Sequence, residues 1–327
     1  MSSKNIRVAV VTPVHNRRDI TLQCLKSLSR INSDGIEVRT FVVDDGSTDG
    51  TGEAIAAAFP DVSVIPGDGT LLFTEGTNVG LRAALAEEPD YVLMMNDDQV
   101  FDPDFLLYLV ETAARYPRSV VGPLLLLWDT PHRLFQTSPQ WSTLSGGWHQ
   151  WQKQTVWTVP KAPWEVELIV GNCVLVPAAA FREAGLMNSS RFPFFGDAEF
   201  TPRLRKRGWR LLIDPRSRVF CQPNTIPARV SKMGFRAKLN ALIFDLRNTH
   251  NLRRRFYAYW DGAPDRLQGT LAFGIFLARV ALRMNAEADR GEDHFERPLS
   301  EVFASRVMSE NGRPTKRGSD KLDEPPL

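Results

Sequence analysis

The sequence predicts an α/β protein with a mixed, mostly parallel sheet and a helical C-terminal extension. Short runs rich in Val and Ile alternate with amphipathic segments of about ten residues between residues 6 and 127, and this alternation is typical of βαβ units. The chain has 327 residues, more than one ordinary α/β domain needs. Acidic pairs follow two of the expected strands, and parallel sheets bind ligands beyond the carboxyl ends of their strands.

The expected elements follow the hydrophobic pattern in chain order. Apolar runs predict strands at residues 6–13, 37–43, 62–65, 91–95, 119–127, 167–177 and 209–213. Helical spacing of apolar residues predicts helices at residues 21–30, 51–59, 78–87, 105–116, 199–206, 238–256 and 266–284.

Residues 128–164 interrupt the alternation. Six of the eight Trp residues lie in this stretch, separated by Gly, Ser, Thr and Pro, so we expect an insertion that forms an excursion or hairpins. We therefore predict one α/β domain at residues 1–225, a helical extension at 226–308 and a disordered polar tail at 309–327.

Composition excludes several classes of protein. Hydrophobic residues make up 43% and charged residues 24% of the chain, which are globular values. The three Cys residues show no C-x-x-C spacing, so neither a disulfide scaffold nor a Cys-rich zinc site is expected. The N-terminus shows no signal-peptide pattern, and no apolar run approaches the ~20 residues of a membrane span. We therefore expect a cytoplasmic protein, with peripheral contact at the inner face of the cell membrane as an open alternative.

The small net charge of +2 is the sum of unlike regions. Residues 1–202 carry a net charge of −9, whereas residues 203–256 carry +13. An acidic region followed by a basic block indicates a metal or nucleotide site ahead of a surface that meets an anion. The alternative for the basic block is a solvated helical face. Nucleic-acid binding is not expected, because no motif of that class accompanies the charge.

Three acidic clusters are candidates for chemistry. Paired carboxylates at Asp97 and Asp98 can hold a divalent cation, or else form a turn that caps the next helix. Asp44 and Asp45 can accept hydrogen bonds from a ribose or a base, or else shape a loop that leads into a helix. Asp197 follows an apolar loop, where burial can raise the pKa of a carboxyl and suit it as a general base; its alternative is a helix cap.

A fourth, weaker candidate is the segment 76–80, which includes Asn78. We expect it to open a helix, so that its backbone N–H groups can face an anion.

Taken in order, six segments resemble glycosyltransferase family 2, in particular its bacterial rhamnosyltransferase-like members. They are the run from Val10 through Thr12, Pro13, His15 and Asn16 to Arg17; the run from Asp44 and Asp45 to Thr51; Asn78-Val-Gly80; Met95-Asn96-Asp97-Asp98; Gly171-Asn-Cys-Val-Leu-Val176; and Gly196-Asp197-Ala-Glu199 with Arg203 and Gly208-Trp209. The resemblance covers about residues 6–213, roughly two thirds of the chain.

The resemblance implies a GT-A fold and an inverting, metal-dependent transfer from a nucleotide-sugar. By matched position, Thr12, Pro13, His15, Asp44 and Asp45 line the nucleoside, Asn78 belongs to the same site, and Asn96 and Asp97 lie near the ribose and diphosphate. Asp98 is the implied ligand of Mg²⁺ or Mn²⁺, and Asp197 is the implied base for the acceptor hydroxyl.

The chain also departs from the family pattern. Asn96 stands where an acidic residue is common, and Gly196 replaces the usual Glu, for which Glu199 is the available substitute. His250 is the only His near the position of a further metal contact, with a structural role on a basic helix as its alternative. The Q-x-x-R-W motif of processive members is absent, which favours the transfer of a single sugar.

The remaining expectations concern substrates and partners. The expected donors are UDP- or dTDP-linked sugars, and the expected acceptor is a glycan or lipid-linked hydroxyl in cell-surface polysaccharide or glycolipid synthesis. Trp141, Trp148 and Trp151 either stack on the acceptor or pack on one another. Helix 266–284 either lies on an anionic membrane or covers the core or a homodimer interface.

Two other functions remain open. A nucleotidyltransferase would show a Gly-rich phosphate loop with a Lys, which residues 12–18 lack. A catalytically degenerate protein that binds nucleotide-sugars or carbohydrates is the alternative that the changes at Asn96 and Gly196 keep open.

Overall fold

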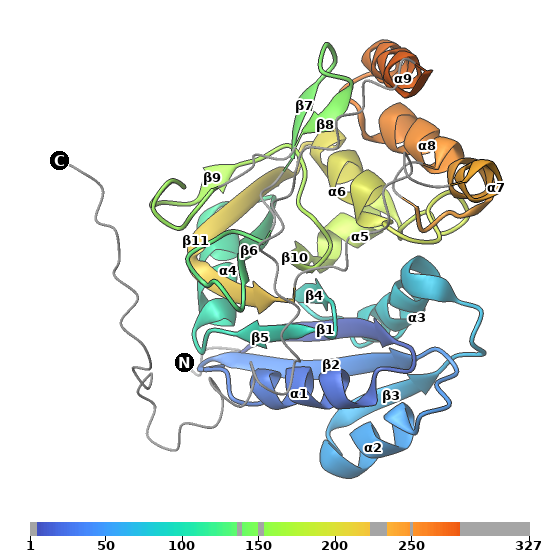
Figure 1. Cartoon of the computed structure of the whole chain (residues 1–327). Coiled ribbons are helices and arrows are strands. Elements are labelled where there is room, and N and C mark those ends of the chain that lie inside the picture. The colour runs from blue at the N-terminus through green and yellow to red at the C-terminus, as the bar shows by residue number, and fades with distance from the viewer. Residues whose placement is uncertain (1–4, 136–138, 150–153, 223–233, 249–250, 282–327) are drawn as a thin grey trace, which may run out of the picture.

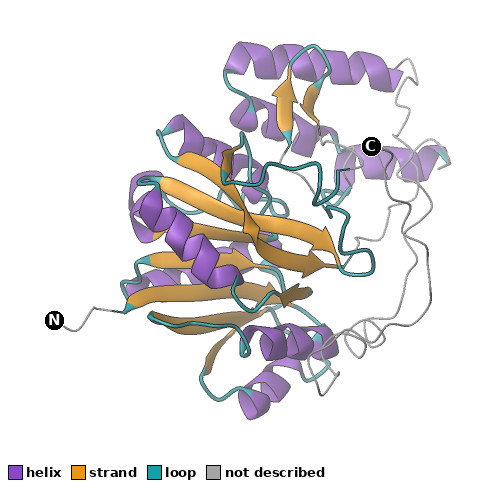
Figure 2. Ribbon diagram, turned by 90° about the vertical axis from the view of Figure 1, so that its left-hand side faces the viewer, coloured by secondary structure: helices purple, strands orange, loops and turns teal. Residues whose placement is uncertain are grey.

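The computed structural model describes residues 5–135, 139–149, 154–222, 234–248 and 251–281. Its centre is one twisted sheet in which helices cover both faces (Figure 1, Figure 2). The strands along this sheet run in the order β3-β2-β1-β4-β10-β6-β11-β5, and β9 pairs with β11 at the side. Their bounds are β1 Ile6–Val14, β2 Ile36–Asp44, β3 Val62–Pro66, β4 Tyr91–Met95, β5 Gln99–Phe101, β6 Ser119–Leu127, β9 Trp164–Glu165, β10 Cys173–Pro177 and β11 Arg210–Cys221.

The direction of the strands places several loops at one edge of the sheet. Strands β1, β2, β3 and β4 are mutually parallel, so the loops after β1, β2 and β4 emerge at the same edge. Strand β10 runs antiparallel to both β4 and β6. The start of β10 therefore lies at that edge too, where the other strands end. The sequence prediction of a mixed, mostly parallel sheet is confirmed.

Alternating side chains of β1 explain why the sheet carries a helical layer on each face. Val8 and Val10 are buried in the core that includes helices α1 and α4, whereas Ala9 and Val11 are buried in the core that includes α3, α5 and α6. Both faces of a parallel strand must be apolar when helices cover both. The bounds are α1 Arg18–Leu28, α2 Thr51–Ala58, α3 Leu72–Ala86, α4 Phe105–Arg115, α5 Ala178–Ala184 and α6 Asp197–Lys206.

Three sequence expectations are corrected at the level of these elements. Helix α3 begins at Leu72, so the segment expected to open a helix at residue 76 lies inside one. The strand expected at residues 167–177 is the shorter β10, Cys173–Pro177. The strand expected at 209–213 continues to Cys221 as β11, which pairs with β6 across a bulge between Asp214 and Arg218.

The C-terminal helices form a separate layer on top of α6. The helix expected at residues 238–256 is divided into α7 Phe235–Leu239, the π-helical turn η2 Asn240–Phe244 and α8 Leu252–Gly262, and α9 Arg266–Ala281 follows. Helix α8 packs on α6 and α9 (Figure 1). The hairpin of β7 Gln140–Ser142 and β8 Gly147–His149 also contacts α9. The boundary expected at residue 225 and the tail 309–327 lie outside the described residues.

Candidate functional site

Three loops meet at the edge where β1, β2 and β4 end. Asn16, which follows β1, ties two of them together: its backbone N–H donates to Ser47 Oγ at 2.8 Å, and its side-chain oxygen accepts from the Thr48 N–H at 2.7 Å. The φ of Asn16 is +52°, a conformation that Asn tolerates better than most residues. Asn16 was quoted within the sequence motif, but spacing alone assigned it no role.

The acidic loop after β4 is neutralised by an arginine from the loop after β1. Arg17 Nε lies 3.1 Å from Asp97 Oδ2, and Arg17 Nη2 lies 2.8 Å from Asp98 Oδ2. Asp97 is almost fully buried and also accepts a hydrogen bond from the Thr21 hydroxyl at 2.8 Å. Burial raises the pKa of Asp97 to about 6, while the charge of Arg17 opposes this rise. Sequence reasoning did not single out Arg17.

The residues of this loop suit a hard divalent cation. Asp97 and Asp98 offer two adjacent carboxylates, and the side-chain oxygen of Asn96 is buried without a hydrogen-bond partner among the described residues. Mg²⁺ is commonly held by one or two carboxylates together with substrate phosphates and water. Within the described ranges no cluster of three His, Cys, Asp or Glu residues could hold a metal without such a substrate. The donor set therefore fits a cation that arrives with a diphosphate.

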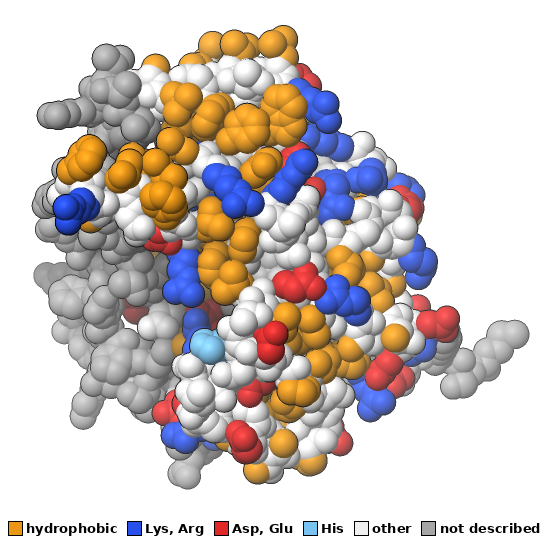
Figure 3. All heavy atoms as spheres, turned by 90° about the vertical axis from the view of Figure 1, so that its right-hand side faces the viewer, with side chains coloured by type: hydrophobic (Ala, Val, Ile, Leu, Met, Phe, Trp, Pro, Cys, Tyr) orange, Lys and Arg blue, Asp and Glu red, His pale blue; other side chains and the backbone are white. Residues whose placement is uncertain are grey.

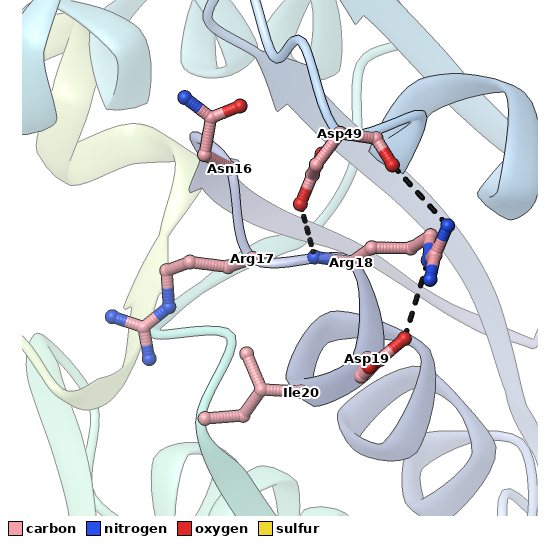
Figure 4. Close-up of a pocket in the computed structure, with 6 residues that line it drawn as sticks. All are labelled: Asn16, Arg17, Arg18, Asp19, Ile20 and Asp49. Atoms are coloured by element: carbon pink, nitrogen blue, oxygen red, sulfur yellow. Dashed lines mark hydrogen bonds and ion pairs between the residues drawn. The ribbon is translucent and has the colours of Figure 1, made fainter.

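A hollow lies at the turn between β1 and α1. It has a volume of about 450 Å³ and is lined by residues of that turn together with Asp49. Figure 4 shows Arg18 directed toward Asp49 while Arg17 extends the opposite way. Arg18 binds Asp19 and Asp49 at the surface. The two neighbouring arginines thus serve different loops.

His15 and Asp45, two of the residues predicted to line the nucleoside, differ in burial and in hydrogen bonding. His15 is exposed, and its Nδ1 lies 2.6 Å from the carbonyl oxygen of Asp45. Asp45 is buried, and its carboxylate accepts backbone N–H groups from Gly69, Leu71 and Leu72. Asp45 therefore organises the loop before α3, and a direct contact with the nucleoside stays a prediction.

The other members of this set are half-buried or enclosed. Asp44 is half-buried and accepts the Ser47 N–H at 3.1 Å, and Pro13 is half-buried at the end of β1. Thr12 is fully buried, and its hydroxyl has no hydrogen-bond partner among the described residues. The Thr12 side chain lies within the sheet and its helical cover, and a contact between Thr12 and the nucleoside stays a prediction.

The Asn78 side chain is buried and forms hydrogen bonds with other parts of the protein. Its amide nitrogen donates to the Met187 carbonyl at 2.9 Å, and its amide oxygen accepts the Met187 N–H at 3.1 Å. Because α3 begins six residues earlier, the backbone N–H groups near Asn78 lie within the helix rather than at its start. The expected anion site at residues 76–80 is therefore wrong, and Asn78 instead positions the segment that leads to Asp197.

Asp197 opens helix α6 and lies against the start of β10. Its Oδ2 accepts the Gly171 N–H at 2.8 Å, and a β-carbon on Gly171 would meet the Asp197 β-carbon at 2.7 Å. Only glycine therefore permits this approach. Burial raises the pKa of Asp197, while the Gly171 N–H and the charge of Arg254 oppose the rise.

The next residue, Asn172, links the acidic loop to the same segment. Its carbonyl oxygen accepts the Asn96 N–H at 2.9 Å and the side-chain amide of Gln99 at 2.6 Å. Two consecutive residues thus bind Asp197 on one side and the Asn96–Asp98 loop on the other. The three acidic clusters of the sequence lie along one edge, and the dipeptide Gly171-Asn172 connects two of them through hydrogen bonds.

The glycine before Asp197 has a packing reason. A β-carbon at Gly196 would lie 2.6 Å from Thr74 Cγ2 and 3.0 Å from Met187 Sδ, so the usual Glu has no room here. Glu199 does not replace it, because Glu199 is buried in an ion pair with Arg203 at 2.5 Å. The departure from the family pattern follows from how α3 packs against this loop.

Two further expectations receive a structural answer. Trp141 packs edge-on against Trp148 and Tyr259, with ring centroids 5.3 Å and 5.7 Å apart, so the alternative of aromatic self-packing holds for Trp141 and Trp148. Trp151 and His250 lie outside the described residues, so the metal role of His250 stays a prediction.

Comparison with known proteins agrees with this geometry. Residues 9–155 match the model of glycosyl transferase family 2. An N-acetylglucosaminyl-diphospho-decaprenol L-rhamnosyltransferase from Mycobacterium tuberculosis is 29% identical over 206 residues, covering 56% of this chain and 66% of that protein, just under two thirds of its length.

Two solved structures share the fold. GalNAc-T7 with UDP, GalNAc and Mn²⁺ has a TM-score of 0.57 at 13% identity, covering 87% of this chain and 58% of the other. The mannosyltransferase PcManGT from Pyrobaculum calidifontis, in complex with GDP-Man and Mn²⁺, has a TM-score of 0.52 at 15% identity, covering 93% and 87%.

The mixed sheet has an acidic loop and a buried aspartate at the edge where β1, β2 and β4 end, which is called the ligand edge below. This arrangement defines a GT-A glycosyltransferase fold. Residues 9–155 match glycosyl transferase family 2, and the chain is similar to a rhamnosyltransferase of that kind over 206 residues.

Proposed function

We propose that this protein transfers a single sugar from a nucleotide-diphosphate sugar to an acceptor hydroxyl, with inversion at the anomeric carbon. The observation that carries the proposal is the dipeptide Gly171-Asn172. The Gly171 N–H donates to the Asp197 carboxylate, and the Asn172 carbonyl accepts the Asn96 N–H. A base and an acidic diphosphate loop held by consecutive residues can serve the two sides of one reacting centre.

Asp197 is the proposed general base. Asp197 begins α6 at the ligand edge, and its Oδ2 accepts the Gly171 N–H. The other carboxylate oxygen, Oδ1, would take the proton of the attacking hydroxyl. Burial brings its pKa closer to the working range of a base than that of an exposed carboxyl.

Asp98, with Asp97, is the proposed holder of Mg²⁺ or Mn²⁺. Arg17 contacts Oδ2 of both carboxylates, so it would be a direct neighbour of a cation held by Asp97 and Asp98. When bound, such a cation stabilises the charge that develops on the leaving diphosphate. The Mn²⁺ named for both GalNAc-T7 and PcManGT supports this proposal.

The substrates are proposed from the relatives. The name of the Mycobacterium tuberculosis relative states a rhamnosyl transfer to an acceptor carried on a lipid diphosphate. We extend this class to the present chain as a UDP- or dTDP-linked donor and a glycan or lipid-linked acceptor of cell-surface polysaccharide or glycolipid synthesis.

A panel of nucleotides tests the proposal. The unfolding temperature of the protein is measured with UDP, dTDP, GDP and CMP, each with and without Mn²⁺. A ligand that binds only the folded state raises that temperature, so we expect a metal-dependent rise for one nucleotide class. No rise with any nucleotide would sink the donor proposal.

A matched variant separates binding from chemistry. Asp197→Asn keeps the shape and the bond from Gly171, so it is expected to retain the nucleotide-dependent rise. Transfer is expected to fall by about 10²–10⁴-fold, the usual contribution of general base catalysis. Near-normal turnover in this variant would show that another group takes the proton.

We also propose that the C-terminal helices rest on an anionic membrane surface. None of the described helices is long and apolar enough to cross a bilayer. However, α9 carries no charged residue from Leu267 to Ala278, and its outward face includes Leu267 and Leu271, which are 70% and 53% exposed. Figure 3 shows hydrophobic side chains gathered over the upper part of the molecule with Lys and Arg beside them. Apolar surface flanked by cations matches an interfacial helix at acidic lipids.

A further inference from the structure

Three consecutive arginines, Arg253, Arg254 and Arg255, lie in the first turn of α8. Cations at the start of a helix are destabilised by the helix dipole, whose positive end lies there. Helix α8 packs against α6, which begins at Asp197. A dense positive charge therefore stands close to the proposed base.

Arg254 is the member of this group that contacts the segment just before the base. Its guanidinium lies 3.4 Å from the centre of the Phe195 ring, two residues before Asp197. The charge of Asp197 raises the pKa of Arg254, and the charge of Arg254 lowers the pKa of Asp197. The two groups are thus within electrostatic reach, although no ion pair within 4.0 Å joins them in the described part of the chain.

Arg254 differs from the arginines that contact buried carboxylates. Arg17, Arg203 and Arg216 each contact a buried carboxylate at 3.2 Å or less. Among the described residues, the Arg254 side chain donates to the Arg247 carbonyl at 3.2 Å and to no carboxylate. Burial and the neighbouring Arg255 lower the pKa of Arg254 to about 9. A shielded cation without a carboxylate partner costs free energy unless a ligand supplies the anion.

Two further groups around Arg254 support an anionic ligand. Arg247 lies over the ring of Phe194, with its guanidinium carbon 5.1 Å from the ring centre. The guanidinium groups of Arg247 and Arg254 thus pack on the rings of two adjacent Phe residues. Asn251, fully buried at the start of α8, has a side-chain nitrogen without a hydrogen-bond partner among the described residues. The planar fork of arginine matches the oxygens of phosphate.

We propose that Arg254, assisted by Arg247, forms a phosphate-binding site beside Asp197. The inference rests on the proposed function, in which phosphate reaches this edge from two sources. One source is the diphosphate of the nucleotide-sugar donor, and the other is the phosphate of a lipid-linked acceptor. Part of the basic block at residues 203–256 would then bind phosphate at the reacting centre.

The test compares Arg254→Gln with Arg253→Gln in the full chain. Arg253 is the adjacent arginine, and it is exposed and donates to the Ser190 carbonyl. Binding of inorganic pyrophosphate, UDP, dTDP, free uridine and an isoprenyl diphosphate is measured by calorimetry. A lost charge-assisted hydrogen bond weakens binding by about tenfold or more, so we expect this loss for phosphate ligands in Arg254→Gln and near-wild-type binding in Arg253→Gln.

Comparison of the ligands shows whether the bound phosphate belongs to the donor or to the acceptor. Loss of UDP or dTDP affinity with unchanged uridine binding assigns the site to the donor. Loss confined to the isoprenyl diphosphate assigns it to the acceptor. Equal binding of every phosphate ligand by wild type and Arg254→Gln would overturn the inference.

Two controls keep the outcome decisive. Circular dichroism verifies that Arg254→Gln is folded, and Arg254→Lys keeps the charge but loses the fork, so its affinity is expected to lie between wild type and Gln. If nucleotides bind and the affinity of every phosphate ligand is unchanged in Arg254→Gln, the inference fails while the proposed function stands. If pyrophosphate binding depends on Arg254 but no nucleotide binds, the site stands and the proposed function fails.

Discussion

Arg17 sets how the acidic loop responds to pH. Asp97 is buried, and its pKa of about 6 lies above that of an ordinary aspartate. The folded protein therefore holds the Asp97 proton more tightly than the unfolded chain, and this contribution to stability is present at low pH and lost as pH rises through about 6. Arg17 limits the loss, because its guanidinium contacts the ionised carboxylate at 3.1 Å.

Replacement of Arg17 by Gln is expected to destabilise the protein mainly above pH 6. Without the cation, the pKa of Asp97 rises further, so the loss of stability extends to higher pH. We expect a cost of about 1–2 kcal/mol at pH 8, since Arg17 is partly exposed, and little difference at pH 4. Urea unfolding at both pH values measures this, with Arg18→Gln as the adjacent control. An equal cost at pH 4 and pH 8 would contradict the assignment.

Single residues were the part of the site that the sequence predicted least well. Asp98 and Asp197 could be proposed from their motifs, because carboxylates after apolar segments carry a recognisable signal. Arg17, Asn172 and Gly196 could not, since their roles depend on contacts with residues more than 70 positions away. A backbone carbonyl such as that of Asn172 leaves no trace in residue type at all.

Helix α3 shows how packing overrides local preference. Its first five residues include Thr74 and Gly76, which favour helices weakly, and the sequence pattern alone predicts a start at residue 78. In the fold, the Thr74 N–H donates to the Pro193 carbonyl at 3.0 Å, and a β-carbon on Gly76 would lie 3.1 Å from Pro13. Most strands were predictable from their apolar runs, whereas helix ends fixed by such tertiary contacts were not.

Two helical glycines offer a matched comparison of packing. A β-carbon at Gly80 would meet Val11 Cγ1 at 2.5 Å and Val43 Cγ2 at 3.1 Å, whereas one at Gly274 meets nothing within 4 Å. Gly80→Ala is expected to lower the free energy of unfolding by about 1–3 kcal/mol through overpacking. Gly274→Ala is expected to raise it by about 0.5–1 kcal/mol through helix preference. Thermal and urea unfolding decide both signs, and a stabilising Gly80→Ala would refute the tight contact.

The molecule as a whole divides its polarity between two ends. The sheet carries its carboxylates at the ligand edge, while the C-terminal layer combines exposed apolar side chains with arginines (Figure 3). From Phe235 to Ala281 the chain carries eight Lys and Arg against three Asp. This layer was predicted from charge and apolar patterning, but its division at Asp245, Asn248 and Asn251 was not, because turn and cap residues act through specific bonds.

Vesicle co-sedimentation tests the membrane surface. The double variant Leu267→Glu with Leu271→Glu places two charges on the outward face of α9, so binding to vesicles of phosphatidylcholine with phosphatidylglycerol is expected to fall at least tenfold. Trp157→Glu, at a 70% exposed side chain before β9, is expected to bind like wild type. Failure of the wild type to bind acidic vesicles would refute the proposal, and dimerisation through Leu267 and Leu271 in sedimentation velocity would assign this face to a second copy.

The reversal of β10 has a consequence for how such proteins diverge. Strand β6 ends at the ligand edge and β10 begins there, so the chain leaves the sheet after Leu127 and, apart from the short strand β9, rejoins it at Cys173 on the same side. The part between β6 and β9 can therefore lengthen or shorten while the strand order stays intact. Relatives can therefore differ in the length of this part while they keep the same sheet and the same ligand edge.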